Sequence, residues 1–145
     1  MGILADIFVC EPADAPKYET RRRAGGISDD PRYLRVEYKD VSGLEFGTLW
    51  ALLENRFWDV RRHMLDDIAY GKSDETWLNQ FPEGFVTLLA GMDTAALVPM
   101  ALRWSQTDEL HGTRPAELQP LLADLNRLAI AAQASGRQMF LWGSL

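Results

Sequence analysis

The chain has 145 residues, enough for one domain with a substantial buried core, and its hydrophobic and charged contents of 47% and 25% are those of an ordinary folded protein. Its net charge of −6 argues against nonspecific binding to nucleic acid or to an anionic membrane, because both need a positive field. The single cysteine, Cys10, excludes an internal disulfide, so the fold must rely on packing.

The N-terminal segment from Ile3 to Cys10 is a short apolar run, which predicts a strand covered on both faces. It lacks a positively charged start and is interrupted by Asp6, so we do not expect it to be a signal peptide. Residues 11–31 follow, with three prolines, a Gly-Gly pair and three consecutive arginines but no periodicity. We expect a long loop there, of the kind that is either functional or mobile.

A strand and a helix are predicted next. Residues 33–39 alternate between apolar and charged side chains, as a half-buried strand does. Ser42 and Glu45 then have the spacing of a helix-capping box. Apolar residues continue on one stripe at about 100° per residue, and they are Phe46, Leu49, Leu53, Phe57, Val60, Met64 and Ile68. The stripe predicts one long helix over about 43–70, with a break near Trp58-Asp59 as the alternative.

The second half of the chain predicts further helices and a final strand. The helices are a short piece over 74–80 after a turn at 71–73, one over 94–110 and one over about 115–135. Residues 82–92 follow helical spacing but are also short enough for a buried strand, so both interpretations stay open. An apolar strand over 138–142 closes the chain.

Together these elements predict an α+β fold. A small sheet of about three strands packs against three or four helices, one of them the long helix over about 43–70. We expect residues 1–145 to form a single globular domain. The first and last strands are the more apolar, so we place them at the centre of the sheet and the alternating strand over 33–39 toward an edge.

One histidine stands among three aspartates, in the group Asp59, His63, Asp66 and Asp67. On the predicted helix His63 lies one turn from Asp59 and one turn from Asp67, a spacing at which two side chains can bind one metal ion. A catalytic zinc needs three protein ligands, however, and the chain has only one other histidine. We therefore interpret the group as the solvated face of a helix with local ion pairs, and expect no metal site.

The other polar motifs do not indicate a specific catalytic or ligand-binding site. Cys10 lacks the flanking residues of a known cysteine-enzyme signature. The arginines at 21–23 precede Gly25-Gly26, which is neither a P-loop nor a dinucleotide fingerprint. The run Asp108–Gly112 is explained by a helix C-terminus. We expect no cofactor.

Trp58 does not fit the apolar stripe, because it falls about 130° from the centre of that stripe. Leu65 lies on the same second face, and Arg61 and Arg62 flank the pair. Trp and Arg dominate binding hot spots, so these four residues are a candidate partner-binding surface. The competing interpretation is that another part of the same chain covers Trp58 and makes it part of the core.

For function, the sequence predicts a small, acidic, noncatalytic module that binds a protein partner or a second copy of itself. An immunity- or antitoxin-like role would be one example, on size and charge alone. The alternative is an enzyme whose site is assembled from separated residues, either Asp59, His63 and Asp67 as a metal-dependent site or Cys10 with a histidine. We expect neither nucleic acid nor membrane as a partner, and a cytoplasmic location, since no apolar run reaches the length of a membrane helix.

Overall fold

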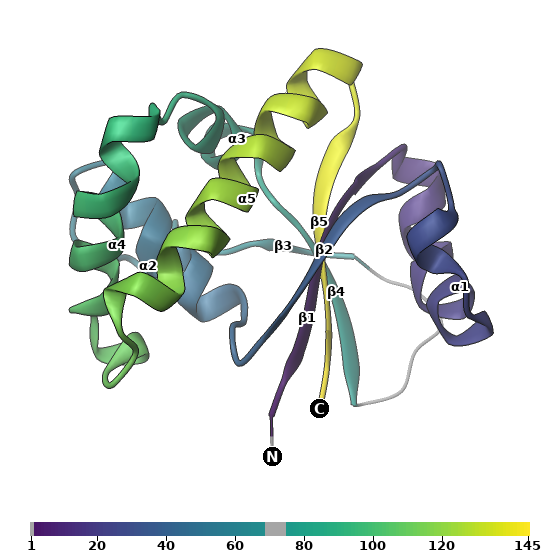
Figure 1. Cartoon of the computed structure of the whole chain (residues 1–145), viewed down its shortest axis with the longest axis horizontal. Helices are drawn as coiled ribbons and strands as arrows, with labels where there is room; N and C mark the ends of the chain where they lie inside the picture. The colour runs from purple at the N-terminus through teal and green to yellow at the C-terminus, as the bar shows by residue number, and fades with distance from the viewer. Residues whose placement is uncertain (1, 69–74) are drawn as a thin grey trace.

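The computed structural model describes residues 2–68 and 75–145, and these residues form an α+β fold around one antiparallel sheet (Figure 1). The five strands in the described part are β1 (Leu4–Cys10), β2 (Leu34–Lys39), β3 (Asp66–Asp67), β4 (Thr76–Gln80) and β5 (Gln138–Ser144). The helices are α1 (Tyr18–Ala24), α2 (Gly43–Leu53), α3 (Glu83–Ala90), α4 (Leu97–Ser105) and α5 (Pro115–Ser135). Short 3-10 turns are η1 (Pro12–Lys17), η2 (Ile27–Asp29), η3 (Thr94–Ala96) and η4 (Asp108–Leu110).

The most apolar strands lie inside the sheet, which confirms the prediction from the sequence. The strand order is β2-β1-β5-β4-β3. β1 pairs with β2 on one side and with β5 on the other, and its residues from Ala5 to Cys10 are all buried. The alternating strand β2 lies at one edge, as its half-exposed pattern predicts.

The sheet is wider than the predicted three strands because β4 and β3 extend it. The sequence suggested a helical piece over 74–80, but Thr76–Gln80 pairs with β5 as a strand. Trp77 pairs with Gly143 of β5, and a Cβ atom at Gly143 would lie 2.1 Å from the Trp77 ring, so the glycine leaves room for the indole on this strand pair. Residue 74 and the predicted turn at 71–73 lie outside the described residues.

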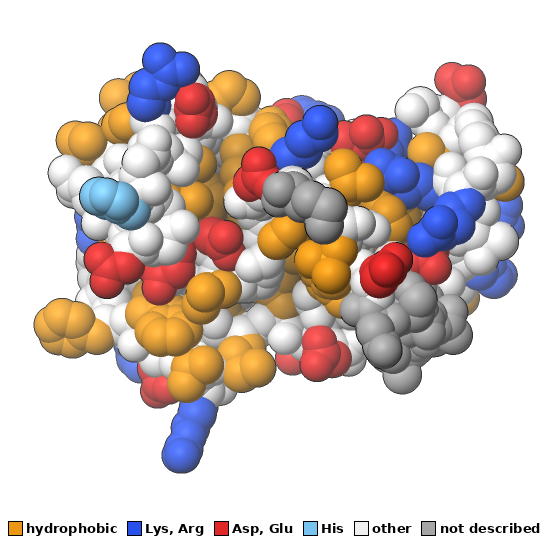
Figure 2. All heavy atoms as spheres, turned by 90° about the horizontal axis from the view of Figure 1, so that it is seen from below, with side chains coloured by type: hydrophobic (Ala, Val, Ile, Leu, Met, Phe, Trp, Pro, Cys, Tyr) orange, Lys and Arg blue, Asp and Glu red, His pale blue; other side chains and the backbone are white. Residues whose placement is uncertain are grey.

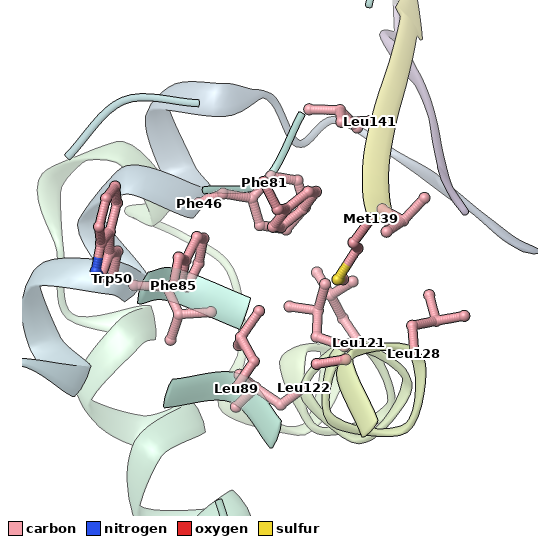
Figure 3. Packing of buried hydrophobic residues seen from close by; sticks show 14 of the residues in the cluster. Phe46, Trp50, Phe81, Phe85, Leu89, Leu121, Leu122, Leu128, Met139 and Leu141 are labelled. Carbon is pink, nitrogen blue, oxygen red and sulfur yellow. The ribbon is translucent and has the colours of Figure 1, made fainter. Parts of the chain in front are cut away.

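Helices cover both faces of the sheet, with α2, α3, α4 and α5 on one side and α1 on the other (Figure 1). The larger core lies under the four helices, and Figure 3 shows its centre. The side chains that meet there include Phe46, Trp50, Phe81, Phe85, Leu89, Leu121, Leu122, Leu128, Met139 and Leu141. Trp50 stacks on Phe85 with ring centroids 5.3 Å apart, which joins α2 to α3.

Residues 11–31 fold into η1, α1 and η2, whereas the sequence predicted a loop. Each helical piece is too short, and the segment too rich in proline, to show periodicity in the sequence. Its side chains nevertheless pack against the sheet. Tyr18 stacks on Phe8 of β1 at 3.9 Å between ring centroids. Its hydroxyl donates to Oδ2 of the buried Asp6 at 2.6 Å, and Arg22 Nε donates to the same oxygen at 2.6 Å.

Two other predictions about helices are settled by the structure. Residues 82–92 were ambiguous, and they form helix α3 over Glu83–Ala90. The predicted helix over 94–110 is broken into η3, α4 and η4. Pro99 lies in the first turn of α4, where backbone N–H groups have no partner within the helix, so the proline costs no hydrogen bond there.

Candidate functional site

The predicted long helix over about 43–70 is wrong beyond Leu53. Helix α2 begins after Ser42, as predicted, although the Ser42 hydroxyl donates to the Glu45 carboxylate at 2.6 Å rather than accepting from the backbone. The helix ends because Asn55 takes a left-handed conformation with φ of 55°, which asparagine tolerates better than most residues. The chain then runs without regular structure to β3.

Glu54 ties this loop together at its base. Its carboxylate accepts from Arg62 Nε at 3.0 Å and from Arg62 Nη2 at 2.5 Å, and it contacts His63 Nε2 at 2.7 Å. The Arg62 guanidinium and, second, the His63 ring lower the pKa of Glu54 to about 2. A single carboxylate thus connects the end of α2 to two residues that are eight and nine positions further along the chain.

His63 is buried inside the loop, although the sequence placed it on the solvated side of a helix. Only 2% of the residue is exposed, and its ring meets Trp50 edge-on at 5.4 Å. The Asp59 amide donates to Nδ1 at 2.9 Å, so Nδ1 carries a lone pair, and Nε2 is left to donate to Glu54. Both ring nitrogens are therefore engaged within the protein.

The loop lies directly on α2 at Gly47. A Cβ atom at this position would be 2.2 Å from the His63 carbonyl oxygen, a distance that no side chain can occupy. The same Cβ would lie 3.4 Å from Nε1 of Trp58. The absence of a side chain at Gly47 is therefore what allows the loop to close over the helix.

The loop and the adjoining first turn of α2 present apolar side chains to solvent. We name this set the apolar loop surface, and it consists of Leu44, Phe57, Trp58, Val60 and Met64. Phe57 is 98% exposed and Met64 is 53% exposed. All of them except Phe57 line a hollow of about 270 Å³, whose floor includes Leu65 and whose edge includes Asp67. On the face drawn in Figure 2, hydrophobic side chains gather at the lower left with charged side chains around them.

The four predicted partner-binding residues lie in this one loop, but not on a helix face. Trp58 is 41% exposed and lines the hollow, and Arg61 is exposed. Arg62 is engaged by Glu54, and Leu65 is buried beneath the hollow. Neither of the two earlier interpretations of Trp58 is complete, because the indole is half covered by its own chain and half open.

Three of the exposed residues were missed because the helical stripe assigned them to the core. Phe57, Val60 and Met64 were expected to be buried, and they are exposed because the helix that would have buried them does not exist. The one local signal was Asn55, since asparagine after an apolar helical run is a known helix stop.

Of the groups proposed for an enzyme, His63 and Asp67 both line the hollow, whereas Asp59 and Cys10 do not. Asp59 accepts from the Arg61 amide, and Asp67 accepts from Asn79 Nδ2 at 2.7 Å. In the described residues no three of the His, Cys, Asp and Glu side chains are grouped as metal ligands would be. Cys10 is buried at the end of β1, and burial, followed by the nearby Asp14 charge, raises the pKa of its thiol to about 12. These contacts account for each group separately, and the enzyme alternative stays a prediction from the sequence.

Comparison with known proteins found no matching family model, no matching curated protein and no matching solved structure. No single helix of residues 2–68 and 75–145 is long and apolar enough to cross a membrane. Only Glu83–Ala90 and Thr94–Ser105 reach that length and composition, and only together, with a bend of 99° between them. The function must therefore be argued from the site itself.

Proposed function

We propose that this chain is a noncatalytic binding module that holds another protein chain on the apolar loop surface. The observation that carries the proposal is Phe57, whose side chain is 98% exposed. Single exposed apolar residues are common, but Phe57 adjoins Trp58 and a hollow with mostly apolar walls. An aromatic side chain of this kind offers on the order of 200 Å² of surface to a partner.

The loop is held in shape before any partner arrives, which favours tight binding. Glu54 fixes Arg62 and His63, and the Asp59 carbonyl accepts from the His63 amide at 2.7 Å. A surface that is already ordered loses less conformational entropy on association than a mobile loop does. The same contacts explain how a segment without regular structure can keep an aromatic side chain pointing into water.

The predicted site residues have separate roles under this proposal. Trp58 and the exposed Arg61 are available to contact the partner, as hot-spot residues do. Arg62 and Leu65 hold the loop in its conformation and would affect binding only through that conformation. The net charge of −6 supports a protein partner over nucleic acid, and we propose a cytoplasmic location on the grounds given by the sequence.

Native mass spectrometry of the protein purified gently from its source cells tests this function. Wild type is compared with Phe57→Ser and with Val98→Ser, a control that removes a 59% exposed apolar side chain from α4. We expect wild type and the Val98 variant to retain a second protein chain and the Phe57 variant to lose it. All three should unfold at the same temperature. Equal retention by all three would contradict the proposal.

A further inference from the structure

The proposed function leaves the partner open, and this inference rests on it. Phe57 projects from the same loop whose neighbouring residues line the hollow, so a knob and a hole belong to one surface. In an interface with two-fold symmetry the same patch serves both partners, so it must be complementary to itself. We propose that the partner is a second copy of this chain, with Phe57 of each copy seated in the hollow of the other.

The walls of the hollow suit a phenyl ring. They are formed by the side chains of Leu44, Trp58, Val60 and Met64, over a floor that includes Leu65. Exchange of the two Phe57 rings would remove both from water and would cover the exposed parts of Trp58 and Met64 at the same time. Met64 can adapt its unbranched side chain to the incoming ring, and sulfur–aromatic contacts are favourable.

The charges around the hollow are also complementary to themselves. Arg56 and Arg61 are exposed side chains of the loop whose Trp58 and Val60 line the hollow, whereas Asp66 and Asp67 belong to β3, and Asp67 itself lines the hollow. Within the described residues no ion pair holds Arg56, Arg61 or Asp66. In a dimer with a two-fold axis through this surface, the second copy is rotated by 180°. The arginines of the loop in one copy then face the aspartates of β3 in the other.

The net charge sets the expected strength of the dimer. Two copies of charge −6 repel each other at long range, so the apolar contact must provide the affinity. A phenyl ring of about 200 Å² is a small part of a standard interface, which buries about 800 Å² on each partner. We therefore expect a reversible dimer with a dissociation constant on the order of micromolar.

Sedimentation velocity across the micromolar range tests the proposal on the full chain. Wild type should shift from the mass of one chain, 16.4 kDa, to twice that mass as its concentration rises. Phe57→Ser should raise the dissociation constant at least about 100-fold, because both copies lose an anchor. Val98→Ser should associate like wild type. A dimer that Phe57→Ser leaves intact would overturn the proposal.

A charge-exchange experiment tests the two-fold arrangement separately. Arg61→Asp and Asp66→Arg should each associate more weakly than wild type, since each brings like charges together across the interface. A mixture of the two variants should form a heterodimer, because each cross-interface pair then joins an aspartate to an arginine. A mixture that associates no better than either variant alone would show that this arrangement is wrong.

The same data separate this inference from the proposed function. If wild type stays monomeric at every concentration, the second copy is not the partner. In that case a different protein retained by wild type, and lost in Phe57→Ser, would still support the binding function. If neither a dimer nor a retained protein depends on Phe57, both proposals fail.

Discussion

Replacement of Gly47 by alanine tests the contact that holds the apolar loop surface in place. A glycine inside a helix normally costs up to about 1 kcal/mol relative to alanine, so Gly→Ala should stabilise α2 if there were room. There is none, because the new Cβ would lie 2.2 Å from the His63 carbonyl oxygen, more than an ångström short of ordinary contact. A backbone carbonyl cannot rotate away, so the loop must move, and the hydrogen bonds of Arg62 and His63 to Glu54 must weaken.

We expect Gly47→Ala to lower the free energy of unfolding by about 2–3 kcal/mol, the range of overpacking together with a lost hydrogen bond. Gly84→Ala is the matched control, because it also places a Cβ on a helix but meets nothing closer than Trp50 Cζ2 at 4.0 Å. The control should be unchanged or more stable by up to about 1 kcal/mol. Urea unfolding measures both. If Gly47→Ala is as stable as the control, the loop does not lie on α2 as described.

Three further predictions concern single polar groups. Glu54 has a folded-state pKa of about 2, below its usual value, so its stabilising contribution is present above pH 4.5 and is lost as the pH falls toward 2. The free energies of unfolding of wild type and Glu54→Gln, measured in urea, should therefore differ at neutral pH and converge in acid. A difference that stays constant with pH would contradict the ion pair with Arg62. Cys10, with a pKa of about 12, should not react with iodoacetamide at pH 8 until the chain is unfolded, and rapid labelling of the native protein would show that the thiol is accessible. Asp6→Asn should lower the free energy of unfolding by roughly 3 kcal/mol, because Arg22 and the nearly buried Arg35 lose the carboxylate that they share. A loss below about 1 kcal/mol would mean that the aromatic contacts of α1 hold it on the sheet instead.

The parts of the fold that could be predicted are those with strong local patterns. Ile3 to Cys10 and residues 138–142 are apolar runs, and both are central strands in the structure. The last helix was expected over about 115–135 and is found at Pro115–Ser135, ended by Gly136 with φ of 69°. β4 could not be predicted as a strand because its identity depends on pairing with β5, whose residues lie at least 60 positions further along the chain.

The sequence pointed to the segment that carries the apolar loop surface, but it assigned that segment the wrong secondary structure. The apolar spacing of Phe57, Val60 and Met64 is compatible with a helix, and periodicity alone cannot show that Asn55 ends it. His63 was placed in solvent because its burial depends on Glu54 and on the missing side chain at Gly47, which are tertiary contacts. The unusual position of Trp58 was the part of the pattern that pointed to this surface.

The central claim, that the apolar loop surface binds another protein chain, is tested most directly by photo-crosslinking in the source cells. A benzophenone amino acid replaces Phe57 in one variant and Val98, an exposed residue of α4, in the other. We predict that light produces a covalent adduct with a second protein chain, identified by mass spectrometry, from position 57 and not from position 98. Equal adducts from both positions, or none from position 57, would contradict the claim.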